Sequence, residues 1–400
     1  MITYQEALSM VFARLQSLPA VEVPLEQATG LVLAEAVNAR WDMPPADNSA
    51  MDGFALAWAP QGTSSEWTVA GSVCAGEPWP TPLESGTVVR IMTGAPLPTG
   101  SDTVVPFEEA VESGATVRLA KMKQGQHVRR QGEEFQAGEL LLEEGTSLYA
   151  GEIGLLAAAG FARVRVHPAP RVALLSTGDE LIELGQTPGP GQIVNSNLYL
   201  LSARLREEGC SVLPLGLCRD EPEALTRHLL AGEQADLILS TGGVSVGDRD
   251  YLREALAARD FETVFWKVAI KPGKPLLFGL LRGKPFFGLP GNPAAAAATF
   301  ELFVRPALRR LAGFSAAAPL RLRAILSDDV HGDHTRECFL WGRLGEQQGQ
   351  LVFSPSPRQG SGQNRSLQGA KALLPVPAGC ALIKAGSSVE IMTIRFCLEH

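Results

Sequence analysis

Residues 237–251 read "LILSTGGVSVGDRDY": an apolar run as long as a buried strand, followed at once by a turn rich in glycine, serine and acid. A strand that only fills a core does not need such an ending. A related ending occurs at residues 174–180, "LLSTGDE", where Ser-Thr-Gly again precedes an acid. We interpret the two stretches as versions of one device at the edge of a sheet, where loops diverge and ligands bind.

Strand and helix patterns alternate around this stretch, from residue 170 to about residue 313. A buried strand is indicated by "RVALLST" and further strands by "CSVLPLGLC" and "KPFFGLP". An amphipathic helix is indicated by "NSNLYLLSARLREEG" and further helices by "EPEALTRHLLAG" and "PAAAAATFELFVRPALRRLAG". Such alternation is typical of an open α/β sheet with helices on both faces. We predict the fold class α/β plus β: a multidomain chain with a central, doubly wound, mostly parallel α/β domain.

The flanking segments predict three further units. The chain opens with an amphipathic helix, with Thr3 and Glu6 as a capping box, which we expect to pack against the helical segment containing Ile153, Leu155 and Leu156. Short strand patterns with frequent turns predict an inserted β module and a C-terminal β domain. The predicted domains are 1–43 plus 137–168 (helical linker and dimerisation), 44–136 (β module), 169–317 (α/β) and 318–400 (C-terminal β).

Composition argues against several functional classes. The formal net charge of −8 argues against binding nucleic acid through a global field, and no segment approaches the ~20 apolar residues of a membrane span. The six cysteines lack zinc or redox spacing, and the first residues do not resemble a secretory signal. We therefore expect a cytoplasmic protein with reduced thiols that binds neither nucleic acid nor membrane.

Acidic and polar residues and Gly-rich turns follow four of the predicted strands. Taken singly, each is an ordinary turn or helix cap. Together, at one sheet edge, their acids and Gly-rich turns predict phosphate groups held through Mg²⁺, which prefers oxygen ligands. The candidates are Thr177, Gly178, Asp179 and Glu180; Arg219, Asp220 and Glu221; Gly242, Gly243, Ser245, Asp248 and Asp250; and Pro290, Gly291, Asn292 and Pro293.

Two further kinds of patch accompany them. In "FWKVAIKPGKP", strand alternation places Lys267 and Lys271 on one face, with Lys274 following. Lysines protect many edge strands, but the apolar neighbours favour contact with an anion. In the β module, the clusters around Asp52, Thr93 and Glu134 are either ordinary turns and a solvated charge run, or carboxylates and a hydroxyl presented to a ligand.

These stretches resemble the molybdopterin molybdenumtransferases, or molybdenum insertases, whose architecture the E domain of gephyrin shares. The similarity covers nearly the whole chain, in family order, and rests on "PPADNSAMDGFA", "RIMTGAPLP", "RRQGEE", "LLSTGDEL", "LSTGGVSVGDRDY", "WKVAIKPGKP" and "GLPGNPAA". It implies a homodimer that takes adenylylated molybdopterin and molybdate, releases AMP in the presence of Mg²⁺, and leaves molybdenum on the dithiolene. Transient contact with other cofactor-biosynthesis proteins would fit this role.

The resemblance also implies roles for individual residues. The family's acids match Asp52, Glu180, Asp220 and Asp250, of which Asp220 and Asp250 would hold Mg²⁺. Its lysines match Lys267, Lys271 and Lys274, and "RQGSGQ" places Ser361 on the molybdate side. Glu134 stands where the family has Asp, Ala295 where Ser is common, and Arg343 is the nearest match to a family arginine whose position Trp341 occupies. Thr93, Ser245 and Pro275 complete the matched positions.

Because the β module and the sheet domain both supply candidates, we predict a cleft between them, with Asp52 and Glu134 reaching across a dimer interface. Two alternatives remain at this point. Another Mg²⁺-dependent phosphohydrolase or nucleotidyl enzyme on the same α/β fold would need the strand-end acids but not the "IKPGKP" stretch or the module patches. A non-enzymatic scaffold would need a fused domain or a long linker, which the sequence does not indicate.

Overall fold

The central sheet is mixed and has the order β17-β14-β18-β22-β21-β19 in a computed structural model that describes residues 1–58, 66–119, 123–243 and 251–394. The first four strands are parallel, and β21 and β19 are attached by antiparallel pairing. The strands predicted at these four stretches are confirmed, and the one predicted to be buried, β14, is buried after its first residue. Their bounds are β14 Arg171–Thr177, β17 Ser211–Cys218, β18 Leu237–Thr241, β19 Phe261–Trp266, β21 Leu277–Leu281 and β22 Lys284–Leu289, with the short pair β15 Leu181–Ile182 and β16 Ile193–Val194 beyond β14.

Helices cover both faces of this sheet, as predicted. One core packs α3 and the α6–α7 segment on one face, and a second core packs α4 and α5 on the other. The long helix expected after residue 292 is interrupted by a π turn, η3. The bounds are α3 Ser196–Glu207, α4 Pro222–Gly232, α5 Tyr251–Ala257, α6 Pro293–Thr299, η3 Phe300–Val304 and α7 Arg305–Leu311.

The first helix, α1 (Tyr4–Ala13), has the predicted capping box but not the predicted partner. The Thr3 hydroxyl accepts from the Glu6 amide, and the Glu6 carboxylate accepts from the Thr3 amide at 2.8 Å. The Tyr4 ring packs edge-on against Phe303 and Phe339, in a core that the α/β and C-terminal domains share. The expected packing against Ile153, Leu155 and Leu156 is therefore wrong, because α2 (Ala150–Ala158) packs on the linker's own strands.

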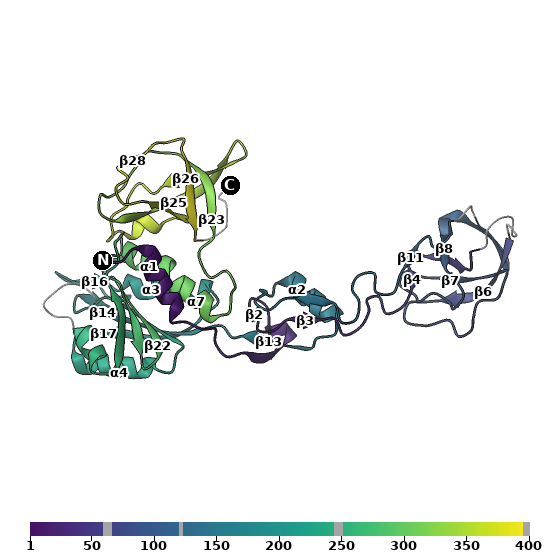
Figure 1. Cartoon of the computed structure of the whole chain (residues 1–400), viewed down its shortest axis with the longest axis horizontal. Coiled ribbons are helices and arrows are strands. Elements are labelled where there is room, and N and C mark those ends of the chain that lie inside the picture. Colours follow the sequence, from purple (N-terminus) through teal and green to yellow (C-terminus); the bar gives the residue numbers. More distant parts are fainter. Residues whose placement is uncertain (59–65, 120–122, 244–250, 395–400) are drawn as a thin grey trace.

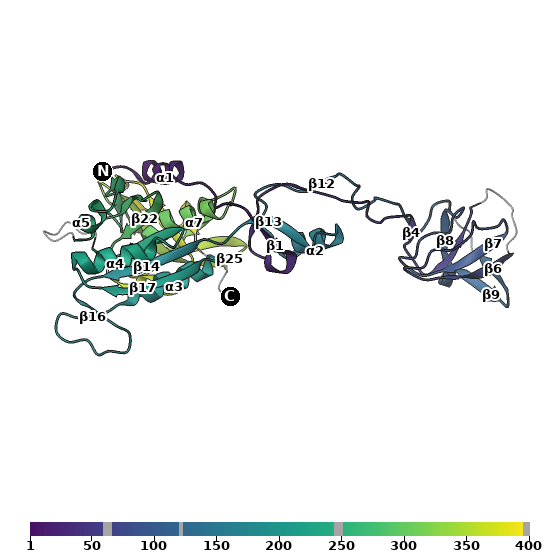
Figure 2. The same ribbon diagram turned by 90° about the horizontal axis from the view of Figure 1, so that it is seen from below.

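The remaining units are built mainly from strands (Figures 1 and 2). The linker domain contains β1 Val21–Pro24, η1 Leu25–Gln27, β2 Val32–Leu33, β3 Val37–Asn38, β12 Leu140–Leu142, α2 and β13 Arg163–His167. The β module contains β4 Asn48–Ser49, β5 Gly53–Leu56, β6 Glu66–Val73, β7 Thr87–Ile91, β8 Thr103–Pro106, η2 Phe107–Glu109, β9 Ala110–Ser113, β10 Thr116–Leu119 and β11 Val128–Arg129. The C-terminal domain contains β23 Arg321–Leu326, β24 Val330–His331, β25 Glu337–Gln347, β26 Gln350–Pro355, η4 Asn364–Leu367, β27 Ala372–Val376, β28 Leu382–Ile383 and β29 Ser388–Thr393.

The molecule is elongated, with the α/β and C-terminal domains together at one end and the β module at the other (Figure 1). The neck between the linker domain and the β module consists of two chain segments, which are joined by hydrogen bonds. Asp42 accepts from the Ala137 amide at 2.8 Å and from Gln131 Nε2 at 2.7 Å, and Asp47 accepts from the Gln131 amide and Arg130 Nη1. These bonds brace the neck, which separates the β module from the other domains of the same chain.

The lysine-bearing strand differs from its prediction. We expected strand alternation to continue from Lys267 to Lys271, but β19 ends at Trp266 because Lys267 adopts a positive φ of 72°. The chain resumes as β20 (Ile270–Lys271), which pairs with β25 and so belongs to the C-terminal sheet. Val268 and Ile270 are fully buried as the alternation predicted. The segment therefore joins two sheets.

Candidate functional site

A cavity of about 550 Å³ lies at the carboxyl ends of the parallel strands, where the sequence placed the site. It brings together eleven of the predicted residues and eight that were not predicted. The predicted ones are Thr177, Gly178, Glu180, Asp220, Gly242, Gly243, Pro275, Pro290, Gly291, Asn292 and Pro293. The others are Leu181, Ile193, Val194, Asn195, Ser196, Asn197, Gly362 and Asn364.

The two Ser-Thr-Gly turns form one wall of this pocket. Strands β14 and β18 are parallel neighbours, so the two turns lie side by side. A Cβ on Gly242 would stand 2.1 Å from the Thr177 carbonyl oxygen, and Gly242 has a φ of +89°. The sequence suggested that Gly242 and Gly243 allow a ligand to approach closely. In the structure, the two turns contact each other at Gly242, and this contact already requires a glycine there.

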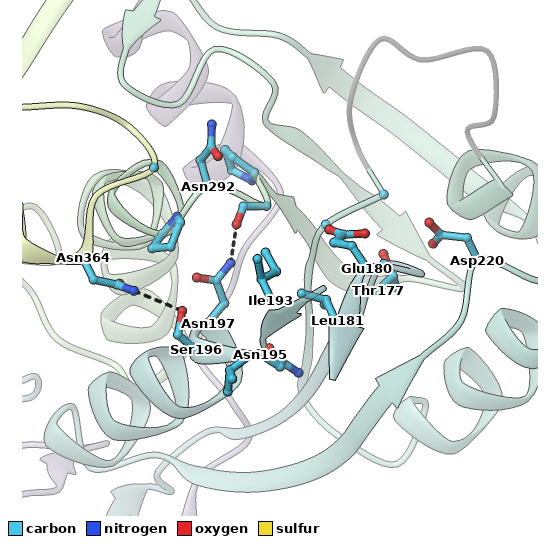
Figure 3. Close-up of a pocket in the computed structure, with 18 of the residues that line it drawn as sticks. Thr177, Glu180, Leu181, Ile193, Asn195, Ser196, Asn197, Asp220, Asn292 and Asn364 are labelled. Carbon is cyan, nitrogen blue, oxygen red and sulfur yellow. Dashed lines mark hydrogen bonds between the residues drawn. The ribbon is translucent and has the colours of Figure 1, made fainter. Parts of the chain in front are cut away.

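One end of the pocket carries carboxylates. Figure 3 shows Glu180 and Asp220 beside Thr177, and the Asp220 amide donates to Asp179 Oδ1 at 3.3 Å. Cys218 ends the adjacent strand β17. Burial, followed by the charges of Asp220 and Glu221, raises the pKa of the Cys218 thiol to about 11. This thiol is therefore protonated at neutral pH and is a poor nucleophile.

The other end of the pocket carries amides. Asn197 and Ser196 begin helix α3, Asn292 precedes α6, and Asn364 comes from the C-terminal domain (Figure 3). The "NSN" stretch was interpreted as a helix start, and Asn195 is indeed the N-cap of α3. Because α3 follows β14, its first turn lies at the same sheet edge as the predicted loops. From this topology, the sequence alone could have identified Asn195 and Asn197 as pocket residues.

A loop of the C-terminal domain closes this amide end. The Ser361 carbonyl accepts from the amides of Ala294 at 2.9 Å and Ala295 at 3.3 Å, which are the first free donors of α6. Asn292 Nδ2 donates to Ser361 Oγ at 3.3 Å, and Asn364 Nδ2 donates to Ser196 Oγ at 3.2 Å. Ser361 therefore lies next to the pocket, as predicted. The start of α6 is capped by protein, so its first amides are not available to an anion.

The predicted cations are spread around the pocket. Lys274 immediately precedes the lining residue Pro275, whereas Lys271 Nζ lies 3.4 Å from Asp333 Oδ2 beside a separate cavity of about 380 Å³. Lys267 Nζ lies 3.7 Å from the centre of the Trp266 ring, a cation–π contact. Arg343 is exposed on β25 and does not line the pocket.

The module residues form a local pair far from this pocket. Asp52 Oδ1 accepts from the Thr93 amide at 2.7 Å and from the Thr93 hydroxyl at 2.8 Å. The Thr93 amide, followed by its hydroxyl, lowers the pKa of the Asp52 carboxyl. Glu134 is exposed near the neck. The predicted cleft between module and sheet domain is wrong for one chain, since the neck holds the two at opposite ends of the molecule (Figure 2).

Comparison with known proteins agrees with this architecture. Three family models match in order: the MoeA N-terminal region (domain I and II) over residues 2–160, a probable molybdopterin binding domain over 173–310, and the MoeA C-terminal region (domain IV) over 323–394. A molybdopterin molybdenumtransferase from Nostoc is 38% identical over 93% of this chain and 88% of its own length. One from Haemophilus influenzae is 37% identical over 81% and 83%. The chain belongs to the molybdopterin molybdenumtransferase family.

A solved structure supports the same assignment for the fold. The molybdopterin biosynthesis MoeA protein from Pyrococcus horikoshii superimposes with a TM-score of 0.86 at 30% identity, over 99% of both chains. The enzyme is therefore a transferase of molybdenum cofactor biosynthesis, with molybdopterin as the substrate and molybdenum as the transferred element. In the described part of the chain, no helix is long and apolar enough to cross a membrane.

The donor set at the carboxylate end fits a hard divalent cation. Glu180 and Asp220 line the same pocket and offer oxygen ligands, which Mg²⁺ prefers, usually with one or two carboxylates and several waters. Among the described residues no group of three or more His, Cys, Asp or Glu side chains is close enough to hold a metal. Ser245, Asp248 and the predicted metal ligand Asp250 lie outside the described residues.

Proposed function

We propose that this pocket binds adenylylated molybdopterin, and that the enzyme breaks its phosphoanhydride bond, releases AMP and transfers molybdenum from molybdate to the dithiolene. The observation that supports the proposal is the division of the pocket into a carboxylate end and an amide end (Figure 3). A phosphoanhydride needs its charge neutralised, whereas a heterocycle needs neutral hydrogen-bonding groups. Such a pocket suits a ligand that carries both.

The carboxylate end would handle the phosphates. Glu180 and Asp220, with Asp250 as predicted, would hold Mg²⁺, which when bound neutralises charge that develops on phosphate oxygens. The turns at Thr177-Gly178 and Gly242-Gly243 shape the wall beside them, where Gly242 allows the two turns to approach each other closely. Their role is to bind and orient the anhydride.

The C-terminal loop would contribute to the molybdate side. Ser361 is held at the pocket by its bonds to α6 and Asn292, and Lys274 is exposed directly before the lining residue Pro275. A lysine ammonium and a hydroxyl both suit a tetrahedral dianion such as molybdate. Lys271 would add positive charge from the neighbouring cavity. Contact of Lys267 and Arg343 with the substrates remains a prediction.

We further propose a cytoplasmic homodimer in which the β module of one copy completes the pocket of the other. The braced neck keeps Asp52, Thr93 and Glu134 away from their own pocket but leaves them exposed to a second copy. Isologous contact of this kind is the commonest arrangement of homodimers. Transient contact with the protein that supplies the adenylylated substrate would fit the open rim of the pocket.

AMP release tests the proposal directly. The purified enzyme is incubated with adenylylated molybdopterin, Mg²⁺ and molybdate, and AMP is quantified by chromatography. We expect Asp220→Asn to slow AMP release by about 100-fold, which is the order of effect seen when one electrostatic contact to a reacting group is removed. Chelation of Mg²⁺ should stop release in the wild-type enzyme.

Glu183→Gln is the matched control, because Glu183 is exposed in the next loop and loses the same charge outside the pocket. It should release AMP at the wild-type rate. If the wild-type enzyme forms no AMP, or if Asp220→Asn and Glu183→Gln behave alike, the proposal is wrong.

A further inference from the structure

Asn197 lies where the two turns that shape the pocket meet. Its Nδ2 donates to Thr241 Oγ1 at 2.9 Å and to the Gly291 carbonyl at 2.7 Å. The Thr241 hydroxyl in turn donates to the Pro290 carbonyl at 3.1 Å. One side chain at the start of α3 therefore ties the turn after β18 to the turn after β22.

The surroundings fix the orientation of this amide. A backbone carbonyl only accepts hydrogen bonds, so the atom that faces Gly291 must be the NH₂ group of Asn197. Asn197 is 8% exposed and Thr241 1%, so water does not replace these bonds easily. A carboxylate of the same shape at position 197 would place an oxygen against the Gly291 carbonyl and lose both donated bonds.

The two turns are close enough for this link to set their spacing. A Cβ on Gly291 would stand 3.8 Å from the Gly242 Cα, which is van der Waals contact, and the Gly242 amide donates to the Leu289 carbonyl at 3.1 Å. Both turns line the pocket. A shift of either turn therefore changes the width of the space between the carboxylate end and the amide end.

We infer that Asn197 is a positioning residue, which holds the Gly242 and Gly291 turns at the spacing that the substrate needs. It acts through the turns and not on the reacting atoms. The inference rests on the proposed function for the identity of the substrate, but the spacing of the turns can be measured without it.

Asn197→Asp provides the first test. At pH 8 the introduced carboxylate cannot donate to Gly291, so kcat/KM for AMP release should fall about tenfold, the effect of losing one to two hydrogen bonds. Burial raises the pKa of an introduced carboxyl group. As the pH falls to 5.5 the protonated carboxyl regains a donor, and kcat/KM relative to wild type should recover at least threefold.

Asn364→Asp is the matched control. Asn364 is exposed at the same end of the pocket, and its partner is the Ser196 hydroxyl, which can donate to a carboxylate as readily as it accepts from an amide. The control should show no recovery between pH 8 and 5.5. Equal pH profiles for the two variants would overturn the inference.

Hydrogen exchange provides the second test and does not depend on activity. The Gly242 amide should exchange about tenfold faster in Asn197→Asp than in wild type at the same pH, while the Asp236 amide of the α/β domain, bonded to the Arg171 carbonyl, stays unchanged as a reference for unfolding of that domain. If Asn197→Asp does not fold, Thr241→Val removes only the hydroxyl link and is read by the same exchange. Unchanged Gly242 exchange in a folded variant would refute the positioning role, whereas missing AMP release in wild type would refute only the proposed function.

Discussion

The two β units of this enzyme, the inserted module and the C-terminal domain, make different contributions to the pocket of their own chain. Each was predicted to supply site residues. The C-terminal domain places Ser361 and Asn364 against the starts of α6 and α3, whereas the module places Asp52 and Thr93 at the far end of the molecule (Figure 1). The difference shows that a sequence motif does not indicate where in the folded chain its residues lie relative to the pocket.

The most decisive experiment on this difference mixes two inactive enzymes. Asp52→Ala damages the module and Glu180→Gln damages the pocket, so each homodimer should lose nearly all AMP release. If the module acts across the dimer, random mixing should restore about a quarter of wild-type activity, because half of the dimers are mixed and each has one intact site of two. The measurement is AMP release after the two variants are refolded together.

The control for this experiment mixes Asp52→Ala with a chain that carries both substitutions, a combination that contains no intact module and should stay inactive. No recovery in the first mixture, with dimers verified by light scattering, would mean that Asp52 and Glu180 act within one chain. Full AMP release by the Asp52→Ala homodimer alone would mean that Asp52 has no role.

A smaller effect is expected at the C-terminal loop. Gln359 Nε2 donates to the carbonyls of Trp341 and Ser356 at 2.9 Å, and its Oε1 accepts from the Trp341 amide at 3.1 Å. Gln359→Leu removes the side-chain partner of the Trp341 amide and of the Ser356 carbonyl, at about 1–3 kcal/mol for a buried group left unpaired, whereas the Trp341 carbonyl keeps its bond from the Ser356 amide. The loop should loosen, and KM for adenylylated molybdopterin should rise about tenfold, with a smaller change in kcat.

Gln368→Leu is a suitable control, since Gln368 is an exposed glutamine at the end of the same segment. Steady-state kinetics of the two variants decide the question. If both variants have the wild-type KM, the C-terminal loop does not shape the pocket. The C-terminal domain would then contribute no more to the pocket of its own chain than the β module does.

The α/β domain could be predicted from sequence because its signals are local. Alternating strands and helices specify a sheet, and the ends of parallel strands share an edge, so Thr177, Asp220, Gly242 and Asn292 had to meet. Asn197 was missed because an asparagine at a helix start has an ordinary capping interpretation. Its second role depends on where Gly291 lies, and no local pattern encodes that.

The errors concern relations between domains. Helix α1 has the amphipathic pattern of any surface helix, and the pattern does not say which apolar surface it covers. Likewise, the positive φ at Lys267 redirects the chain from one sheet to another, although the apolar residues on both sides suggested one strand. Tertiary packing decides such cases, and periodicity does not report it.

The smallest expected effect lies within the module itself. The Thr93 amide and hydroxyl lower the pKa of Asp52, so the ionised form stabilises the module above the ordinary carboxyl pKa of about 4, and this contribution is lost as the pH falls through the lowered value. Thr93→Val removes the hydroxyl but keeps the amide. The pKa of Asp52 should rise toward, but not reach, the ordinary value, as followed by carboxyl ¹³C NMR of aspartate-labelled enzyme. Thr99→Val, another exposed threonine of the module, should leave it unchanged. An equal pKa in all three proteins would show that the hydroxyl does not hold the carboxylate, and that Thr93 contributes to the module through its backbone alone.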